Sequence, residues 1–242
     1  MAAAQIGRWS EGVIGVDRAL IRRRDGAIMA FAIGPPCGQG RPADRLAAIV
    51  GGRVTAIRIC RQVHGAVVHH PSDTNGPVRE VGDGDALVTT TRGLALAVWT
   101  ADCVPVLLSA PGVVAAVHAG WRGCAVDVVG AVVRQIEARH RCPPGGLTAA
   151  LGPAVCGGCY EVGAEVRRAL RDSGLDETRW RDRDRVDLRG FLVARLEALG
   201  LAPDRVDTVG GCTFESAELA SYRRDGAAAG RQWSMVVLTG EE

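Results

Sequence analysis

The sequence contains no lysine, so all 29 basic residues are arginines. Schiff-base catalysis, pyridoxal phosphate attachment and the Walker-type phosphate loop each need a lysine amine, and all three are therefore excluded. The net charge is only +2, which leaves no electrostatic footprint for nucleic acid or anionic lipid. We therefore expect small-molecule partners, with no nucleic acid and no membrane among them.

Long apolar runs are also missing. No run reaches the roughly 18 residues of a membrane span, and the first 15 residues lack the charged start and apolar stretch of a secretory signal. The eight cysteines are irregularly spaced, several of them in apolar contexts such as those of Cys60, Cys103 and Cys124. This placement suits a reducing compartment better than a disulfide framework. We expect a cytoplasmic protein whose cysteines are mostly buried free thiols.

Several catalytic motifs are absent from the sequence. No G-x-G-x-x-G follows a predicted strand, no G-x-S-x-G is found, and the H-x-E and P-C-x-x-C pair of zinc nucleobase deaminases is missing. Cys156 and Cys159 form one C-x-x-C, but no second pair follows at a suitable spacing for a structural zinc site. We interpret them as two thiols of a glycine-rich loop, with redox activity as the alternative.

Two short apolar runs dominate the centre of the chain. Leu94 to Trp99 and Val113 to Val117 are apolar, contain β-branched residues and are bounded by turn formers, which predicts buried strands. Cys103 follows the first run and His118 ends the second. If the two strands are neighbours in one sheet, the thiol and the imidazole meet at its edge.

Other segments give weaker predictions. Val54 to Cys60 predicts a strand that runs toward His64, and residues 71–82 predict a long loop. Pro42 to Val50 predicts a helix. Apolar residues recur at helical spacing from Ala125 to Ile136, so the turn at residues 120–123 is expected to open into an amphipathic helix. With 242 residues and 47% apolar composition, the chain is long enough for one sizeable core.

Two histidines and a cysteine each stand where a predicted strand meets a turn. His64, Cys103 and His118 offer the nitrogen and sulfur ligands that zinc prefers, and three protein ligands leave the open fourth position of a catalytic site. Their spacing matches no local zinc motif.

The same residues allow a metal-free hypothesis in which Cys103 is a nucleophile and His118 favours its thiolate. Asp102 or Gln62 would then orient the imidazole. The two hypotheses exclude one another, because a thiolate bound to zinc is not free to attack. Arg122, at the start of the predicted helix, is either an anion ligand or an ordinary surface residue.

At these motifs the chain resembles the YfiH family of laccase-domain proteins, which is also called the purine nucleoside phosphorylase or polyphenol oxidase family. The motifs run in order from about residue 62 to residue 238, whereas residues 1–61 diverge. The resemblance rests on Gln62–Gly65 (QVHG), Gly84–Thr89 (GDALVT), Thr100–Val106 (TADCVPV), Val117–Gly123 (VHAGWRG), Gly152-Pro153 with Cys159–Val162 (CYEV), and Ser221–Gly226 (SYRRDG) with Gly230-Arg231.

The resemblance implies a fold and a site. It implies an α+β fold in a single domain over residues 1–242, with mixed β-sheets flanked by helices, related to the catalytic domain of a cysteine-hydrolase toxin. It implies zinc as the cofactor, with copper as the alternative. The implied metal ligands are His64, Cys103 and His118. We expect Gln62, Arg122, Arg45 and Tyr160 to bind the substrate.

The resemblance also implies a reaction. Members act on purine nucleosides, by phosphorolysis of adenosine, inosine or methylthioadenosine and by deamination of adenosine. Nucleoside and phosphate are then the substrates. We expect Asp102 to be the proton donor to the leaving base. Where the family has an asparagine–arginine pair this chain has Asp44-Arg45, and an acidic side chain there repels phosphate.

Two alternatives accompany this hypothesis. One is a Cys–His amidohydrolase that acts on a peptidoglycan precursor or a specialised metabolite, with Cys103 as nucleophile. The other is a catalytically silent binding protein that is stabilised by its metal.

Overall fold

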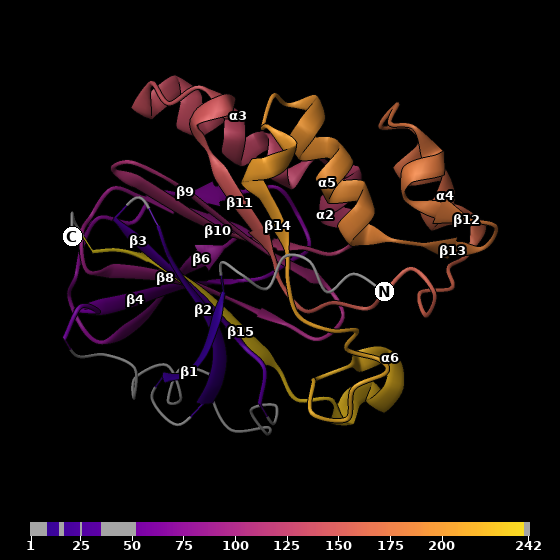
Figure 1. Cartoon of the computed structure of the whole chain (residues 1–242), viewed down its shortest axis with the longest axis horizontal. Helices are drawn as coiled ribbons and strands as arrows, with labels where there is room; N and C mark the ends of the chain where they lie inside the picture. The colour runs from indigo at the N-terminus through magenta and orange to yellow at the C-terminus, as the bar shows by residue number, and fades with distance from the viewer. Residues whose placement is uncertain (1–8, 15–16, 25, 35–51, 240–242) are drawn as a thin grey trace.

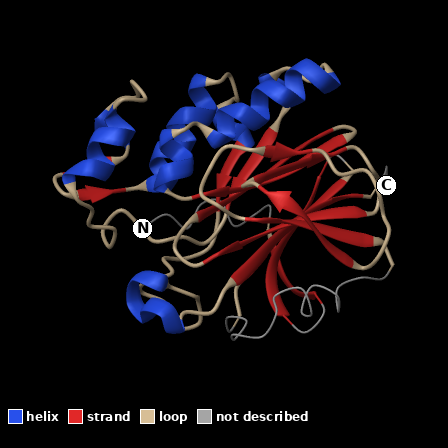
Figure 2. Cartoon of the chain, turned by 180° about the vertical axis from the view of Figure 1, so that it is seen from behind, coloured by secondary structure: helices blue, strands red, loops and turns tan. Residues whose placement is uncertain are grey.

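The computed structural model describes residues 9–14, 17–24, 26–34 and 52–239. In these residues, two large β-sheets lie face to face and helices cover the outer face of one of them (Figure 1). Seen from behind, the helices gather mainly along one side of the strands (Figure 2). The architecture is an α+β fold with mixed sheets flanked by helices, as predicted.

The first sheet has seven strands among the described residues. In spatial order they are β1 (Ser10–Ile14), β2 (Asp17–Arg24), β3 (Ala27–Ala32), β15 (Gln232–Leu238), β8 (Leu94–Thr100), β4 (Ala56–Arg61) and β6 (Val78–Asp83). The second sheet has six, in the order β14 (Val206–Thr208), β11 (Thr148–Leu151), β9 (Val104–Ala110), β10 (Val113–Ala119), β7 (Ala86–Thr89) and β5 (Val68–His69). A short hairpin is formed by β12 (Arg181–Asp182) and β13 (Arg185–Val186).

The helices follow the central strands in sequence. The α-helices are α2 (Trp121–Ala125), α3 (Val128–His140), α4 (Ala164–Arg171), α5 (Leu188–Ala198) and α6 (Tyr222–Asp225). The 3-10 turns are η2 (Pro144–Gly146), η3 (Glu177–Arg179), η4 (Pro203–Arg205) and η5 (Gly226–Ala228). None of the helices in the described segments is long and apolar enough to cross a membrane.

Strands β8 and β10 are buried on both faces, which explains their continuous apolar sequences. Successive side chains of a strand point to opposite faces. On β10, Val113, Ala115 and Val117 pack toward the helices, whereas Val114 and Ala116 pack toward the other sheet. Each strand therefore needs apolar side chains at every position, as the sequence predicted.

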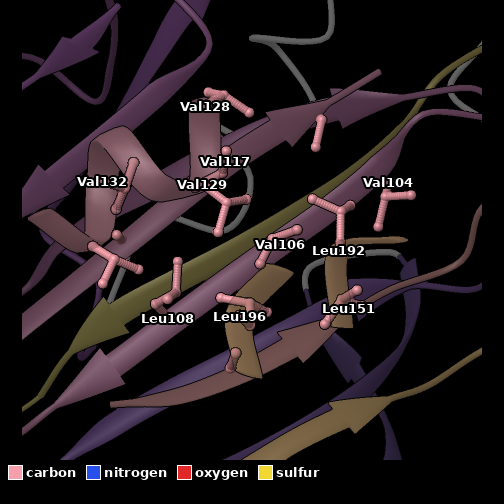
Figure 3. Packing of buried hydrophobic residues seen from close by; sticks show 14 of the residues in the cluster. Val104, Val106, Leu108, Val117, Val128, Val129, Val132, Leu151, Leu192 and Leu196 are labelled. Atoms are coloured by element: carbon pink, nitrogen blue, oxygen red, sulfur yellow. The ribbon is translucent and has the colours of Figure 1, made fainter. Parts of the chain in front are cut away.

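The helices α3 and α5 bury their apolar faces on the outer side of the six-stranded sheet. Figure 3 shows Val129 and Val132 of α3 and Leu192 and Leu196 of α5 packed with strand residues such as Val106. The predicted helix is divided in two, because Asp127 adopts a left-handed conformation (φ 58°) between α2 and α3. Its carboxylate caps α3 by accepting a hydrogen bond from the Gly130 N–H (3.1 Å).

We expect Asp127→Ala to lower the free energy of unfolding by about 2–3 kcal/mol, since the change removes a helix cap and a charge-assisted pair. Asp127 binds Arg195 of α5 through two hydrogen bonds (2.9 and 2.7 Å) and Arg134 through one (2.9 Å). Denaturant unfolding measures the loss. Asp127→Asn keeps the capping oxygen and tolerates the backbone conformation but removes the charge. No loss in Asp127→Asn would contradict the assigned role of the charge, and an equal loss in both variants would contradict the assigned role of the cap.

The same carboxylate makes the stability of the fold depend on pH in the acidic range. Burial alone would raise the pKa of Asp127, but its hydrogen bonds to Arg195 and Arg134 hold that pKa below its usual value. The stabilisation is complete above the unfolded pKa of about 4 and is lost as the pH falls through the lowered folded pKa. Asp127→Ala should lose less stability on acidification than the wild type.

Two segments differ from the sequence predictions. Residues 78–83 form β6 rather than part of a loop, because an edge strand gains hydrogen bonds from β4 without the apolar pattern of a buried strand. Cys103 follows β8 and His118 lies near the end of β10, and these strands belong to different sheets, so the condition of two neighbouring strands in one sheet is not met. The helix predicted over Pro42 to Val50 and the substrate residue Arg45 lie outside the described residues.

Candidate active site

Three strand ends bring His64, Cys103 and His118 together. β4 and β8 are parallel neighbours, so the loops that carry His64 and Cys103 leave the sheet at the same edge. Cys103 lies on the crossover from β8 in one sheet to β9 in the other. His118, near the end of β10, pairs with Pro105 at the start of β9. The cluster is therefore at the junction of the two sheets.

The three ligand atoms lie within 4.8 Å of one another. The two imidazole rings are 4.8 Å apart between centroids and nearly perpendicular, at 79°. Gly120 makes this approach feasible, because a Cβ atom on it would stand 2.8 Å from the Cys103 sulfur and 3.1 Å from Cδ2 of His64. A nitrogen–nitrogen–sulfur set of this size fits a zinc ion with an open fourth position.

Asp85 organises the cluster. Strand pairing places Ala86 opposite Val117, so Asp85 faces His118 across the two strands. The fully buried carboxylate receives a hydrogen bond from His118 Nδ1 (2.8 Å) and from the backbone N–H groups of Val63 (3.2 Å), His64 (2.9 Å) and Gly65 (2.7 Å). The Nδ1–H bond leaves Nε2 of His118 as the ligand atom, which is the usual carboxylate–histidine arrangement of metal sites.

This geometry also shifts the proton equilibria of the cluster. Burial alone would raise the pKa of the Cys103 thiol, but hydrogen bonds from His118 and His64 lower it to about 6. Burial alone would lower the pKa of His118, but its hydrogen bonds to Asp85 and Cys103 raise it to about 9. Without a metal, the pair is therefore a thiolate and an imidazolium between these two values.

We expect Cys103 in metal-free protein to react with iodoacetamide at a rate that rises through about pH 6. The thiolate is the reactive form, and the reaction rate of an ordinary thiol would rise through about pH 8.5. His118→Ala should move the midpoint upward, toward the ordinary value. Mass spectrometry of the Cys103 peptide measures the rate, with Cys142, whose pKa burial raises, as the internal control. A wild-type midpoint above pH 8 would contradict the assigned pair.

A cavity of about 530 Å³ opens onto the cluster. This volume lies in the range of small-molecule sites. Its lining combines the three cluster residues with aromatic rings and two guanidinium groups: Cys60, Gln62, His64, Trp99, Ala101, Asp102, Cys103, His118, Tyr160, Tyr222, Arg223 and Arg231. The guanidinium of Arg223 lies 5.1 Å from the centre of the Tyr160 ring. The cavity can therefore bind an anion and a planar group together.

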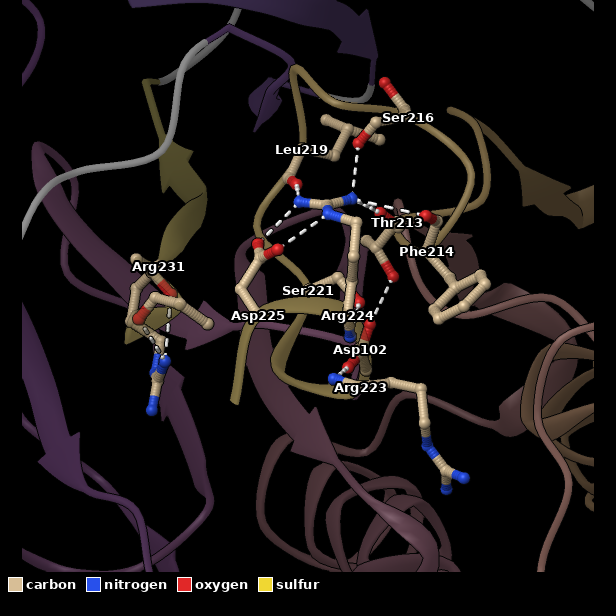
Figure 4. Close-up of polar contacts among 12 residues, drawn as sticks. Asp102, Thr213, Phe214, Ser216, Leu219, Ser221, Arg223, Arg224, Asp225 and Arg231 are labelled. Atoms are coloured by element: carbon tan, nitrogen blue, oxygen red, sulfur yellow. Dashed lines mark hydrogen bonds and ion pairs between the residues drawn. The ribbon is translucent and has the colours of Figure 1, made fainter. Parts of the chain in front are cut away.

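Asp102 does not bind the His118 imidazole. One oxygen of its carboxylate accepts a hydrogen bond from the Thr213 hydroxyl and the other from the Arg223 backbone N–H, both at 2.6 Å (Figure 4). Gln62 binds the backbone of Trp99 through both ends of its amide (2.8 Å each). The predicted orientation of the imidazole by Asp102 or Gln62 is thus corrected to Asp85, which the sequence placed within a motif but gave no role.

The arginines that line the cavity are not the arginine that the sequence indicated. Arg122 does not line the cavity, and its guanidinium lies over the Trp121 ring, 4.3 Å from the centre. Arg223 and Arg231 line it instead. Both stand in the C-terminal motifs of the resemblance, but nothing in their local sequence distinguishes them from the many other arginines.

The family model described as "Multi-copper polyphenol oxidoreductase laccase" matches residues 41–239. Curated relatives include a purine nucleoside phosphorylase of Deinococcus radiodurans, 39% identical over 204 residues that cover 82% of this chain and 76% of the relative. Purine nucleoside phosphorylase ORF3 of Streptomyces griseus is 41% identical over 206 residues, 82% of each protein.

Two solved structures share the fold. The hypothetical protein YfiH of Bacillus licheniformis superposes with a TM-score of 0.84 at 22% identity, and YlmD of Geobacillus stearothermophilus with 0.81 at 25%. Each alignment covers 96% of this chain and 99% of the other. The overall architecture is therefore the same along nearly the whole chain.

Proposed function

The chain belongs to the multi-copper polyphenol oxidoreductase laccase family, and from this membership we propose that it is a zinc-dependent enzyme that acts on purine nucleosides. Its curated relatives carry the name purine nucleoside phosphorylase, which supports phosphorolysis as the first reaction to test. Deamination of adenosine is the second. The observation that carries the proposal is the convergence of His64, Cys103 and His118 on a cavity that two guanidinium groups also line.

The metal ligands would be His64, Cys103 and His118, with Asp85 holding His118 in the required tautomer. A zinc ion bound there would supply Lewis-acid chemistry, polarising a substrate oxygen or lowering the pKa of a water molecule. The cavity residues would bind the nucleoside and the phosphate next to the cluster.

Phosphorolysis forms a bond between a phosphate oxygen and C1′ of the ribose and breaks the bond from C1′ to the purine nitrogen. Arg223 and Arg231 supply positive charge for the phosphate, and arginine favours bidentate contacts with such anions. Burial raises the pKa of Tyr160 to about 12, so its hydroxyl keeps its proton and can donate a hydrogen bond to the departing base. Asp102 is not suited to that task, because both of its oxygens accept hydrogen bonds within the wall.

The test is incubation of the zinc-loaded protein with adenosine, inosine or methylthioadenosine, with and without phosphate, followed by chromatography. Free base and ribose 1-phosphate that form only with phosphate indicate phosphorolysis, and inosine from adenosine indicates deamination. Arg231→Met should raise KM for phosphate more than it changes KM for the nucleoside. No turnover of any purine nucleoside, together with a melting temperature that falls on chelation, would support a metal-stabilised binding protein instead.

One observation favours a second candidate. Cys103, His118 and Asp85 have the order of a nucleophile, a base and an orienting carboxylate, and the thiolate is the favoured form of Cys103 at neutral pH. This order suits an amidohydrolase that acts on a peptidoglycan precursor or a specialised metabolite. Activity that survives chelation, with a covalent adduct on Cys103 after exposure to an electrophilic substrate analogue, would favour this candidate over the zinc enzyme.

A further inference from the structure

A second group of metal-ligand side chains lies outside the candidate active site. Cys156 and Cys159 come from the loop after β11, and Cys212 and Glu215 come from the segment after β14. Each pair has the same spacing, one as C-x-x-C and the other as C-x-x-E. We propose that these four residues bind a structural zinc ion, separate from the one at His64, Cys103 and His118.

The four ligand atoms lie close enough together for a tetrahedral site. All lie within 4.8 Å of one another, and the Cys159 sulfur is 3.4 Å from Oε1 of Glu215. Bond lengths of about 2.3 Å for Zn–S and about 2.0–2.2 Å for Zn–O set the ligand atoms of a tetrahedron about 3.5–3.8 Å apart. A zinc ion therefore fits with small side-chain adjustments.

The backbone holds the two pairs against each other. Ala154 forms a parallel bridge with Cys212, and the Thr213 N–H donates to the Ala154 carbonyl (3.1 Å). The Cys156 N–H points at the Cys212 sulfur (3.3 Å), and the Cys159 N–H closes a turn onto the Cys156 carbonyl (2.9 Å). The site is thus formed by two ordered turns rather than by a chance meeting of flexible side chains.

The donor set indicates which metal binds and what it does. Three sulfurs and one carboxylate complete four-coordination, which is the closed arrangement of structural zinc, whereas the His64 cluster leaves a position open. Cysteine is compatible with this role, because the cysteines of the described segments are all free of disulfides.

A metal here would fasten one wall of the cavity. Thr213, between the ligands Cys212 and Glu215, donates its hydroxyl hydrogen bond to Asp102 (2.6 Å), the residue before Cys103. The guanidinium of Arg224 gathers carbonyl groups of the same segment, those of Thr213 (2.7 Å), Ser216 (2.8 Å) and Leu219 (2.8 Å) (Figure 4). Zinc would join this segment to the loop that carries Tyr160.

The experiment compares zinc content, by atomic spectrometry, in protein purified with zinc and then dialysed. We expect about two zinc ions per chain in the wild type, about one in Cys159→Ser or Glu215→Gln, and about one in His64→Ala, in line with one ion per tetrahedral site. Combining Cys159→Ser with His64→Ala should remove both. Cys142→Ser, which changes a cysteine outside both groups, should keep both ions.

Cobalt substitution identifies the ligands independently of folding yield. Cobalt-loaded His64→Ala should keep a strong thiolate-to-metal charge-transfer band from three sulfurs. Cobalt-loaded Glu215→Gln should show this band altered, and because Glu215 is exposed the substitution leaves the core unchanged. Zinc that disappears completely with His64→Ala while remaining unchanged in Cys159→Ser would overturn the proposal. So would a disulfide between two of the three cysteines in freshly purified protein.

Sequence reasoning missed this second pair for two reasons. The second pair contains a glutamate, Glu215, in place of a second cysteine. Cys212 and Glu215 also lie far from Cys156 and Cys159 along the chain. Cys156 and Cys159, interpreted from the sequence as two thiols of a glycine-rich loop, lie in this four-residue group.

Discussion

Asp85→Ala is expected to lower the free energy of unfolding by about 3–5 kcal/mol, the cost of removing one partner from a buried charged contact. Four donors converge on this carboxylate: His118 Nδ1 and the backbone N–H groups of Val63, His64 and Gly65. In the variant these four donors lose their acceptor. The loop that carries His64 also loses the contact that holds it next to β10.

The same change should weaken zinc binding at the His64 cluster about 10–100-fold, as expected when the partner of a metal-binding histidine is lost. Asp85→Asn is the informative companion variant. Its amide nitrogen would face donors, so it should recover only part of the stability.

Denaturant unfolding and competition with a zinc chelator measure these two effects. Asp83→Ala is the matched control, because Asp83 is an exposed acidic residue nearby whose ion pair is with Arg61. An exposed pair of this kind contributes about 0–1 kcal/mol. Equal losses in Asp85→Ala and Asp83→Ala would show that Asp85 does not organise the site.

Gly120→Ala is expected to reduce turnover on the order of 100-fold, because a displacement of about 1 Å among reacting groups can cost that much. The new Cβ atom would meet the Cys103 sulfur at 2.8 Å and His64 at 3.1 Å. The Cys103 sulfur or the His64 ring must therefore move. The backbone conformation (φ −82°, ψ 175°) is open to any residue, so the effect is one of space alone.

Gly163→Ala is a close control for this variant. Gly163 also precedes a helix in an extended conformation (φ −69°, ψ 168°), and its Cβ atom would meet nothing within 4 Å. Both variants share any cost of alanine at a helix N-cap. We expect Gly163→Ala to keep full activity and zinc content, whereas Gly120→Ala should lose zinc from the His64 cluster. Retention of that zinc and of normal turnover in Gly120→Ala would contradict the proposed geometry.

The three clustered residues and the carboxylate that contacts them differ in how far the sequence could predict them. His64, Cys103 and His118 were identifiable because their types are rare in this chain and each follows a strand pattern. Asp85 was not, because one carboxylate among 27 acidic residues carries no local sign of a partner 33 positions away. Asp102 was the more obvious candidate from its position beside Cys103, yet its carboxylate is directed to Thr213 and Arg223.

The sequence by itself determined the strands that are buried on both faces, the helix that follows Gly120 and the residue types available for metal binding. These properties depend on side-chain chemistry and local periodicity, which can be read from neighbouring residues. The tertiary structure alone decided that β8 and β10 belong to different sheets, that Asp85 faces His118, and that Cys212 and Glu215 meet Cys156 and Cys159. Such pairings depend on the packing of distant segments, because strand register and loop contacts are determined by the whole core rather than by any one stretch of chain.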